Sequence, residues 1–264
     1  MLKIIHRFFY AWLFLTKLPA PPLPRATKED WGRIAPYFVL IGFILGLILF
    51  YAAKTFSSIK LPVLFSALLV LLLWVLITGA LHLDGVFDTF DGIGCQDKER
   101  KIEAIRDSRI GAFGAMGGIF VILFKLITLG TIILNKMFFV ILFALPLSRL
   151  AAVYSFTFLK KSTQEGKGYI SSSYIIDGVK KPFDFLFNLL LFSTFLVVLN
   201  FFFKLSFLFF LFISFIISLL WSYWLHHHFK GHSGDTYGAL IELSEVTILS
   251  LAVVFKNYLL GLDL

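Results

Sequence analysis

The stretch from Gly79 to Gly118, GALHLDGVFDTFDGIGCQDKERKIEAIRDSRIGAFGAMGG, decides how the rest of the chain is interpreted. It follows the strongly apolar run Leu61–Leu81, yet it carries five aspartates: Asp84, Asp88, Asp91, Asp97 and Asp107. Carboxylates this close to hydrocarbon are costly unless they bind a partner or take part in chemistry. The stretch therefore predicts a functional site at the end of a membrane-spanning helix.

Three of these aspartates share one face if the stretch is helical. With Asp84 at 0° and about 100° per residue, Asp88 falls near 40° and Asp91 near 340°. The opposite side is apolar, with Val86, Phe87, Phe90 and Ile93. Three carboxylates on one face favour a hard divalent cation such as Mg²⁺, which completes its shell with water and phosphate. The alternative is that Asp-Gly pairs at 84–85 and 91–92 form solvated turns.

The composition predicts an all-α, polytopic membrane protein. Of 264 residues, 59% are hydrophobic and only 15% are charged, and 33 are phenylalanine. That excess of apolar side chains is typical of membrane spans. We attribute the net charge of +8 to loops that face an anionic leaflet, not to nucleic acid. The single cysteine, Cys95, cannot form an internal disulfide.

About seven apolar segments are expected to span the membrane as one domain covering residues 1–264. The last is the weakest because Glu242 and Glu245 interrupt its start. Met1–Pro24 has no cleavage site after its apolar part, so we expect a retained helix at the membrane interface. The expected spans are Ala35–Ala53, Leu61–Leu81, Gly111–Leu134, Met137–Phe156, Phe183–Phe203, Leu205–Leu225 and Ile241–Tyr258.

Lysine and arginine gather on one side of this predicted topology. Residues 1–34, 82–110, 157–182 and 226–240 hold six, five, five and one of them, whereas the alternate loops hold four. By the positive-inside rule the first group faces the cytoplasm. The loops 82–110, 157–182 and 226–240 are then expected to build a site on the cytoplasmic face of the cell inner membrane.

Two further features follow the acidic stretch. Gln96–Arg106 is expected to form a short charged helix. Arg106 and Arg109 flank Asp107 before the next helix, so they could bind phosphate, while Asp107 could simply cap that helix. Small residues from Gly111 to Gly118 predict close helix packing.

A second polar cluster runs from His226 to Asp235. Consecutive histidines without partner cysteines argue against zinc and equally fit an interfacial belt. Asp235 starts the next helix, either as its N-cap or as an outer metal ligand. Glu242 and Glu245 follow in an apolar helix and need a partner, for which Arg149 is a candidate. The loop Lys160–Lys181, which contains glycines and serines, is interpreted as a mobile lid over phosphates.

At this point the motifs resemble a known family. GALHLDGVFDTFDG at Gly79–Gly92 and RDSRIGAFG at Arg106–Gly114 resemble cobalamin synthase, the adenosylcobinamide-GDP ribazoletransferase family. FLTKLP at Phe14–Pro19 and GDTYGALIELSE at Gly234–Glu245 agree with it. Lys17 stands where the family commonly has arginine, and Cys95 lies in a turn that is usually richer in glycine. The three middle-to-late spans carry no matching motif.

The resemblance implies a Mg²⁺-dependent transfer. A hydroxyl of α-ribazole, or of its 5′-phosphate, attacks the phosphorus next to cobinamide in adenosylcobinamide-GDP. GMP leaves, and adenosylcobalamin or its 5′-phosphate forms. The metal is assigned to Asp84, Asp88 and Asp91, and the phosphate to Arg106 and Arg109. The candidate catalytic residues are His82, Asp107 and Asp235. Glu242, Glu245 and Arg149 are candidates for supporting these residues without contacting the substrate.

His82 is the candidate base for the attacking hydroxyl, although it equally fits a supporting or interfacial position. Two other functions compete with this one. An alcohol phosphotransferase of phospholipid synthesis also uses spaced aspartates, but it needs Ala-Arg where Val86-Phe87-Asp88 stands. A carboxylate-lined cation transporter would need acids near mid-membrane, whereas most acids here lie at the ends of the spans. Homo-oligomerisation is left open.

Overall fold

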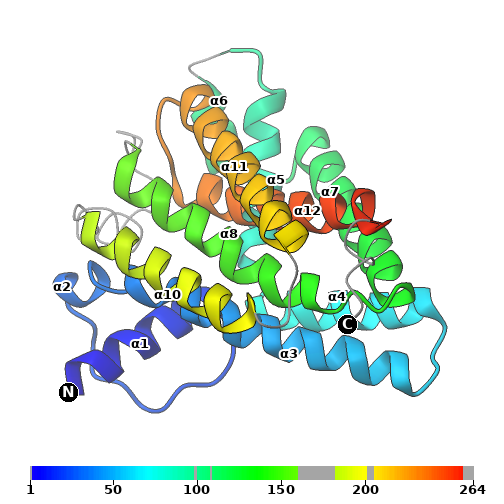
Figure 1. Cartoon of the computed structure of the whole chain (residues 1–264). Helices are drawn as coiled ribbons and strands as arrows, with labels where there is room; N and C mark the ends of the chain where they lie inside the picture. The colour runs from blue at the N-terminus through cyan, green and yellow to red at the C-terminus, as the bar shows by residue number, and fades with distance from the viewer. Residues whose placement is uncertain (1, 98–99, 108, 160–181, 201–204, 258–264) are drawn as a thin grey trace.

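The computed structural model describes residues 2–97, 100–107, 109–159, 182–200 and 205–257 (Figure 1). Within those ranges it is helical and contains no strand, which confirms the all-α prediction. The predicted loop Lys160–Lys181 lies outside the described residues. The helices are α1 (Leu2–Leu15), α2 (Lys28–Trp31), η1 (Ala35–Tyr37), α3 (Phe38–Ser58), α4 (Val63–Thr78), α5 (Leu81–Gly94), α6 (Arg100–Arg106), α7 (Ala112–Leu134), α8 (Phe139–Phe158), α10 (Pro182–Asn200), α11 (Leu205–His228) and α12 (Gly234–Val254).

Long apolar helices confirm a polytopic membrane protein. In the described part of the chain, five helical segments are long and apolar enough to cross a bilayer: Lys28–Ser58, Ala112–Leu134, Phe139–Phe158, Phe207–His228 and Gly234–Val254. The pair α4 and α5 passes that test only together, and it is bent by 90°. Within α10 the described apolar part is shorter, Phe185–Thr194. The count of seven spans therefore stays a prediction.

Helix α12 lies at the centre of the bundle, where it packs against α5, α7, α8 and α11 (Figure 1). The expected span Ile241–Tyr258 begins too late, because the helix already starts at Gly234. Ser233 and Thr236 form a capping box at that start. Two glutamates inside this helix are buried, with ion pairs from neighbouring helices.

A sharp bend separates α4 from α5. Gly79 has φ +63° and Ala80 has φ +56°, so two successive residues adopt the left-handed conformation. The expected span Leu61–Leu81 thus ends early, at Thr78. Lys17 closes the bend from outside: its backbone N–H donates to Ile77 O at 2.8 Å. Its side chain also occupies the space that a side chain at Gly79 would need.

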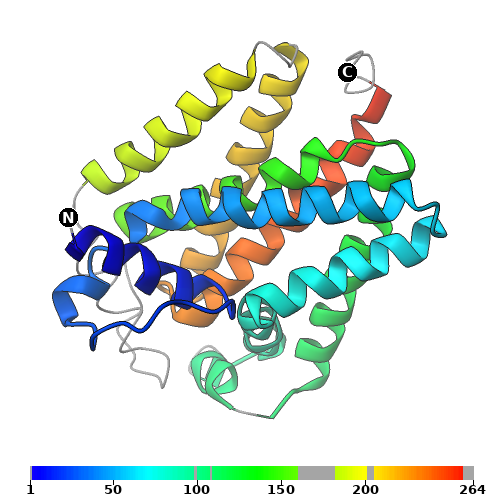
Figure 2. The same ribbon diagram turned by 90° about the horizontal axis from the view of Figure 1, so that it is seen from below.

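The N-terminal helix is held against the segment that follows it. Arg7 contacts Glu29 at 3.2 Å and Asp30 at 3.3 Å, which joins α1 to α2. Figure 2 shows this pair at one edge of the bundle, while α3 and α4 run side by side. A helix at Leu2–Leu15 confirms that part of the prediction, and its position at the membrane interface stays a prediction.

Candidate functional site

Helix α5 carries the three aspartates of the predicted metal site. Leu81–Gly94 is one helix, so the alternative of separate Asp-Gly turns is wrong. Asp84 is exposed, and Asp88 and Asp91 are partly exposed, whereas Val86 on the other side is fully buried. The helical face deduced from the sequence is therefore present, with its apolar side in a core that Leu225, Phe229 and Leu240 also line.

Helix α12 brings a fourth carboxylate to this face. A side chain at Gly85 would lie only 2.5 Å from Asp235 O, and one at Gly238 only 3.2 Å from His82 Cα, so the two helices touch backbone to backbone. Asp88 consequently lies within electrostatic range of Asp84, Asp91 and Asp235. Asp235 itself is not the N-cap of α12, because Ser233 fills that position.

Asp91 has a structural partner of its own. Its Oδ2 accepts the N–H of Gly111 and its Oδ1 the N–H of Gly114, both at 2.7 Å. These are N–H groups at the start of α7, which has no side-chain cap from its own N-cap residue. Asp91 supplies the cap from a neighbouring helix, so the capping role considered for Asp107 is wrong. Each carboxylate oxygen keeps a lone pair that could still face a cation.

The small residues of α7 confirm the predicted close packing. A side chain at Gly114 would lie 2.6 Å from Phe87 O, and one at Gly117 or Gly118 would collide with the ring of Phe90 or Phe87. The aromatic side of α5 thus packs directly on the glycine-rich face of α7. This contact holds the acidic helix between α7 and α12.

The basic segment after α6 forms a pair at the surface. Arg109 Nη2 donates to Asp107 Oδ2 at 2.8 Å, and 87% of the Arg109 side chain is exposed. The hydrogen bonds from Arg109 lower the pKa of Asp107 to about 2. They also raise the pKa of Arg109. A short helix ends at Arg106 as predicted, but α6 begins at Arg100 and not at Gln96. The Arg106 side chain lies outside the described part.

His82 lies on the other side of α5 from the aspartates. Its side chain is only 4% exposed, and its Nδ1 has no hydrogen-bond partner among the described residues. The charges that act on it belong to Arg149, Glu245 and Lys125. The structure therefore does not bring His82 together with the acidic face, and its role as a base stays a prediction.

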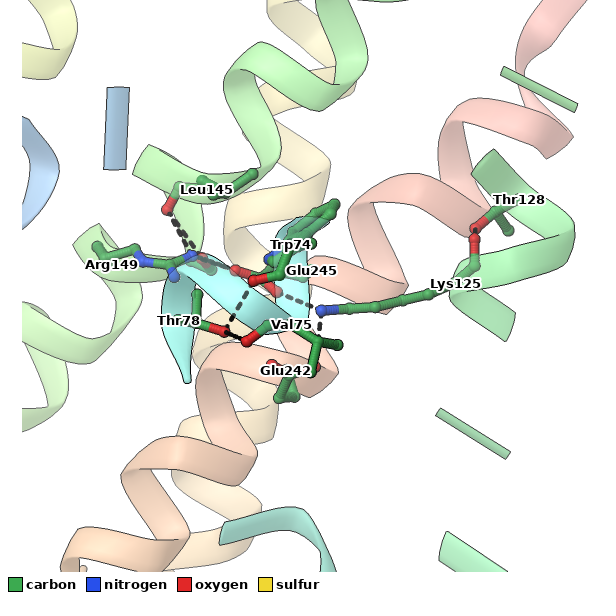
Figure 3. Close-up of polar contacts among 10 residues, drawn as sticks. Trp74, Val75, Thr78, Lys125, Thr128, Leu145, Arg149, Glu242 and Glu245 are labelled. Carbon is green, nitrogen blue, oxygen red and sulfur yellow. Dashed lines mark hydrogen bonds and ion pairs between the residues drawn. The ribbon is translucent and has the colours of Figure 1, made fainter. Parts of the chain in front are cut away.

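The two glutamates of α12 are held by buried cations (Figure 3). Lys125 Nζ lies 2.6 Å from an oxygen of both Glu242 and Glu245. Arg149 Nη1 forms an ion pair with the other oxygen of Glu245. The sequence prediction that Arg149 is a partner is confirmed. Lys125 was missed as a partner, although a single lysine in the middle of an apolar span was the available signal.

The histidine cluster is divided between structural contacts. His232 is buried, with Nδ1 3.2 Å from Thr236 Oγ1 and Nε2 3.1 Å from Ser222 O. Lys101 Nζ lies 2.8 Å from Nε2 of His228.

Across the described residues, no three His, Cys, Asp or Glu side chains are arranged to enclose a metal ion. The predicted three-carboxylate metal site of Asp84, Asp88 and Asp91 is therefore not preformed in the described part of the chain, and the bound metal stays a prediction.

The fold and this site define a class: a polytopic helical membrane protein with four carboxylates gathered where α5 meets α12. The model of the cobalamin-5-phosphate synthase family matches residues 7–253, and the chain belongs to this family. It is 34% identical over 250 residues to the adenosylcobinamide-GDP ribazoletransferase of Thermoanaerobacter pseudethanolicus, covering 93% of this chain and 96% of the relative.

Two further relatives carry the same name. The protein of Trichormus variabilis is 33% identical, over 92% of this chain and 94% of its own length. That of Clostridium tetani is 32% identical, over 97% of this chain and 100% of its own length. No solved structure matches the chain significantly.

Proposed function

We propose that this chain is an adenosylcobinamide-GDP ribazoletransferase that acts late in cobalamin synthesis. Family membership and relatives of that name, similar over nearly the whole of both chains, support the proposal. The structural observation that carries it is the convergence of α5 and α12, which gathers Asp84, Asp88, Asp91 and Asp235. Phosphoryl transfer depends on neutralising and orienting a diphosphate, and such a face can do so through a cation.

The reaction forms one P–O bond and breaks another. A hydroxyl of α-ribazole, or of its 5′-phosphate, bonds to the phosphorus next to cobinamide. The bond from that phosphorus to the bridging oxygen of the diphosphate breaks, and GMP leaves with the electron pair. The hydroxyl proton passes to a base or to water. The developing negative charge on the GMP phosphate is what the site must stabilise.

One or two of Asp84, Asp88 and Asp91 would bind Mg²⁺, with water and the diphosphate completing its shell and Asp235 nearby on α12. When bound, the ion would polarise the diphosphate and neutralise the departing GMP. Asp91 would contribute less freely than the others, since both of its oxygens already accept backbone N–H groups. That pairing fixes the orientation of its carboxylate. The donor set consists only of oxygen, which is the chemistry that Mg²⁺ prefers.

Arg109 is the better supported of the two phosphate-binding candidates. Its guanidinium is exposed and paired with Asp107 at the surface. A diphosphate could exchange for that carboxylate, because both accept the same paired N–H donors. For the proton, Asp235 is better placed than the buried His82 to receive it from the attacking hydroxyl. We place this site on the cytoplasmic face of the cell inner membrane, following the distribution of lysine and arginine.

The direct test uses the full chain purified in lipid nanodiscs. Adenosylcobinamide-GDP, α-ribazole and Mg²⁺ are added, and the cobalamin product and GMP are measured by chromatography and mass spectrometry. We expect both products in equal amounts, and none when Mg²⁺ is chelated. Glu103→Gln, at an exposed position on α6, is the matched control and keeps full activity. A folded wild-type protein that forms neither product would overturn the proposal.

A further inference from the structure

Four charged side chains are buried together inside the helix bundle, away from the proposed reaction. Lys125 and Glu242 are 3% and 4% exposed, and Arg149 and Glu245 are fully buried. Removing charges from water is costly in free energy, and only good pairing offsets that cost. The arrangement therefore calls for a reason beyond packing.

The pairing joins three helices at one point. Lys125 of α7 reaches Glu242 and Glu245 of α12 at 2.6 Å each, and Arg149 of α8 holds Glu245 from the opposite side (Figure 3). Ser148 Oγ adds a longer contact of 3.4 Å to Glu245. Glu245 is thus held through both of its oxygens, by cations from two different helices.

A fourth helix encloses the pair. Lys125 Nζ lies 4.2 Å from the centre of the Trp74 ring, which brings α4 against the ammonium group. Trp74 itself is 1% exposed. Arg149 Nη1 is further fixed by Leu145 O at 3.3 Å and Ser148 Oγ at 2.9 Å. Besides their glutamates, Lys125 thus contacts α4 and Arg149 Nη1 is bonded within its own helix, α8.

The same helix, α12, carries Asp235 to the acidic face. Asp235 precedes Glu242 by about two helical turns, so the two side chains project from nearly the same side of α12. Between them, Gly238 lies against His82, and Gly85 of α5 lies against Asp235. A rotation of α12 about its axis would therefore move Asp235 away from Asp88 and bring bulkier neighbours into a contact that accepts only glycine.

We propose that Lys125, together with Arg149, is a positioning residue: the two cations fix the rotation of α12 so that Asp235 stays beside Asp88. The inference uses the proposed transferase only for its activity readout. The charges act through geometry, because replacing a buried ion pair by uncharged residues can leave stability almost unchanged while removing the single preferred arrangement. The network is thus expected to be more important for turnover than for folding.

The test compares two variants. Lys125→Met alone leaves Glu242 without its cation, and we expect poor folding. Lys125→Met combined with Glu242→Gln removes one charge of each sign and leaves Glu245 paired with Arg149. We expect this double variant to unfold at nearly the wild-type temperature, yet to turn over about 10- to 100-fold more slowly, with KM for both substrates little changed. Lys54→Met, at an exposed position on α3, is the matched control and keeps both properties.

A second measurement does not depend on activity. With Cys95→Ser as background, spin labels at Leu81→Cys and Gly234→Cys report the distance between the starts of α5 and α12. Both positions are exposed. We expect a narrow distance distribution in the wild-type network and in Lys125→Arg, and a broader one in the double variant. Turnover of the Lys125→Arg variant should also be close to that of the wild type, because the cation is retained.

The outcomes separate the two proposals. A folded double variant with the wild-type distance distribution would overturn the positioning role of Lys125, whatever its activity. Wild-type turnover in that variant would overturn it too. If the wild-type protein forms no cobalamin but the distances change as expected, the proposed reaction fails and the positioning role stands.

Discussion

The acidic face of α5 and the buried network around Glu242 and Glu245 both contain several carboxylates. The two regions differ in which charges lie next to those carboxylates. Glu242 and Glu245 each meet a cation at ion-pair distance, deep in the bundle. Asp84 and Asp88 have no such ion pair within the described part of the chain, although they lie in reach of water and of each other's charge. Matched charges indicate structure, whereas a group of unmatched like charges is unstable by itself and favours a bound cation.

Asp91 stands between these two cases. No side-chain cation of the described residues pairs with its carboxylate, and two backbone N–H groups at the start of α7 bind it instead. The partial positive charge of a helix N-terminus partly compensates its own charge. The three aspartates that the sequence grouped as equals are therefore expected to respond differently to substitution.

The largest effect is expected at the unmatched carboxylates. Asp88→Asn should lower turnover by about 100- to 1,000-fold, because a carboxylate that would hold the cation against the diphosphate is lost. The unfolding temperature should stay the same or rise, since repulsion from Asp84, Asp91 and Asp235 is relieved. Turnover is measured as GMP release and stability by thermal unfolding in detergent. Full activity in a folded Asp88→Asn protein would remove the metal site from the proposal.

The opposite pattern is expected at the matched carboxylates. Glu245→Gln leaves Lys125 and Arg149 with excess positive charge in the core and should destabilise the fold by about 3–5 kcal/mol. The measurement is again thermal unfolding, with Asp84→Asn as the comparison at an exposed position. If both variants lost the same stability, the distinction between the two regions would be wrong.

Much of the α5 face could be predicted from the sequence, because a helix with period 3.6 places residues at i, i+4 and i+7 on one side whatever surrounds it. The bend at Gly79 could not be placed, since an apolar run continues through it and a non-glycine residue, Ala80, shares its positive φ. Contacts between distant segments could not be predicted either. The sequence around Asp235 does not indicate that it lies near Asp88, and the sequence around Lys125 does not indicate which helix it contacts.

The capping of α7 shows the same limit. Sequence preferences predict an N-cap residue close to the helix start in the chain, and Asp107 is of the preferred type. The actual cap comes from Asp91 on another helix, which only the packed structure reveals. By contrast, the pairing of Arg149 with the glutamates was predictable in kind, because a buried carboxylate in a membrane span requires a cation.

A smaller effect on stability is expected from Asp91→Ala. Two N–H groups of α7 lose their acceptor, and the cost should be about 1–2 kcal/mol, as for other helix caps. Asp91→Asn retains one acceptor oxygen and should lose less. Thermal unfolding of both variants, compared with Asp88→Ala, isolates the capping contribution. A loss in Asp88→Ala as large as in Asp91→Ala would contradict the role of Asp91 as a cap.

The smallest effect is expected at the exposed pair Arg109–Asp107. Arg109→Gln should raise KM for adenosylcobinamide-GDP about five- to tenfold, the size of one charge-assisted contact, with kcat little changed. The pKa of Asp107 is lowered to about 2, so its stabilising contribution is complete above the ordinary range of Asp and is lost only as the pH falls toward 2. Asp107→Asn should accordingly leave the shape of the pH profile between 5.5 and 8 unchanged. A new inflection of activity in that range would show that Asp107 takes part in proton transfer, which would place it with the unmatched carboxylates and not with a surface pair.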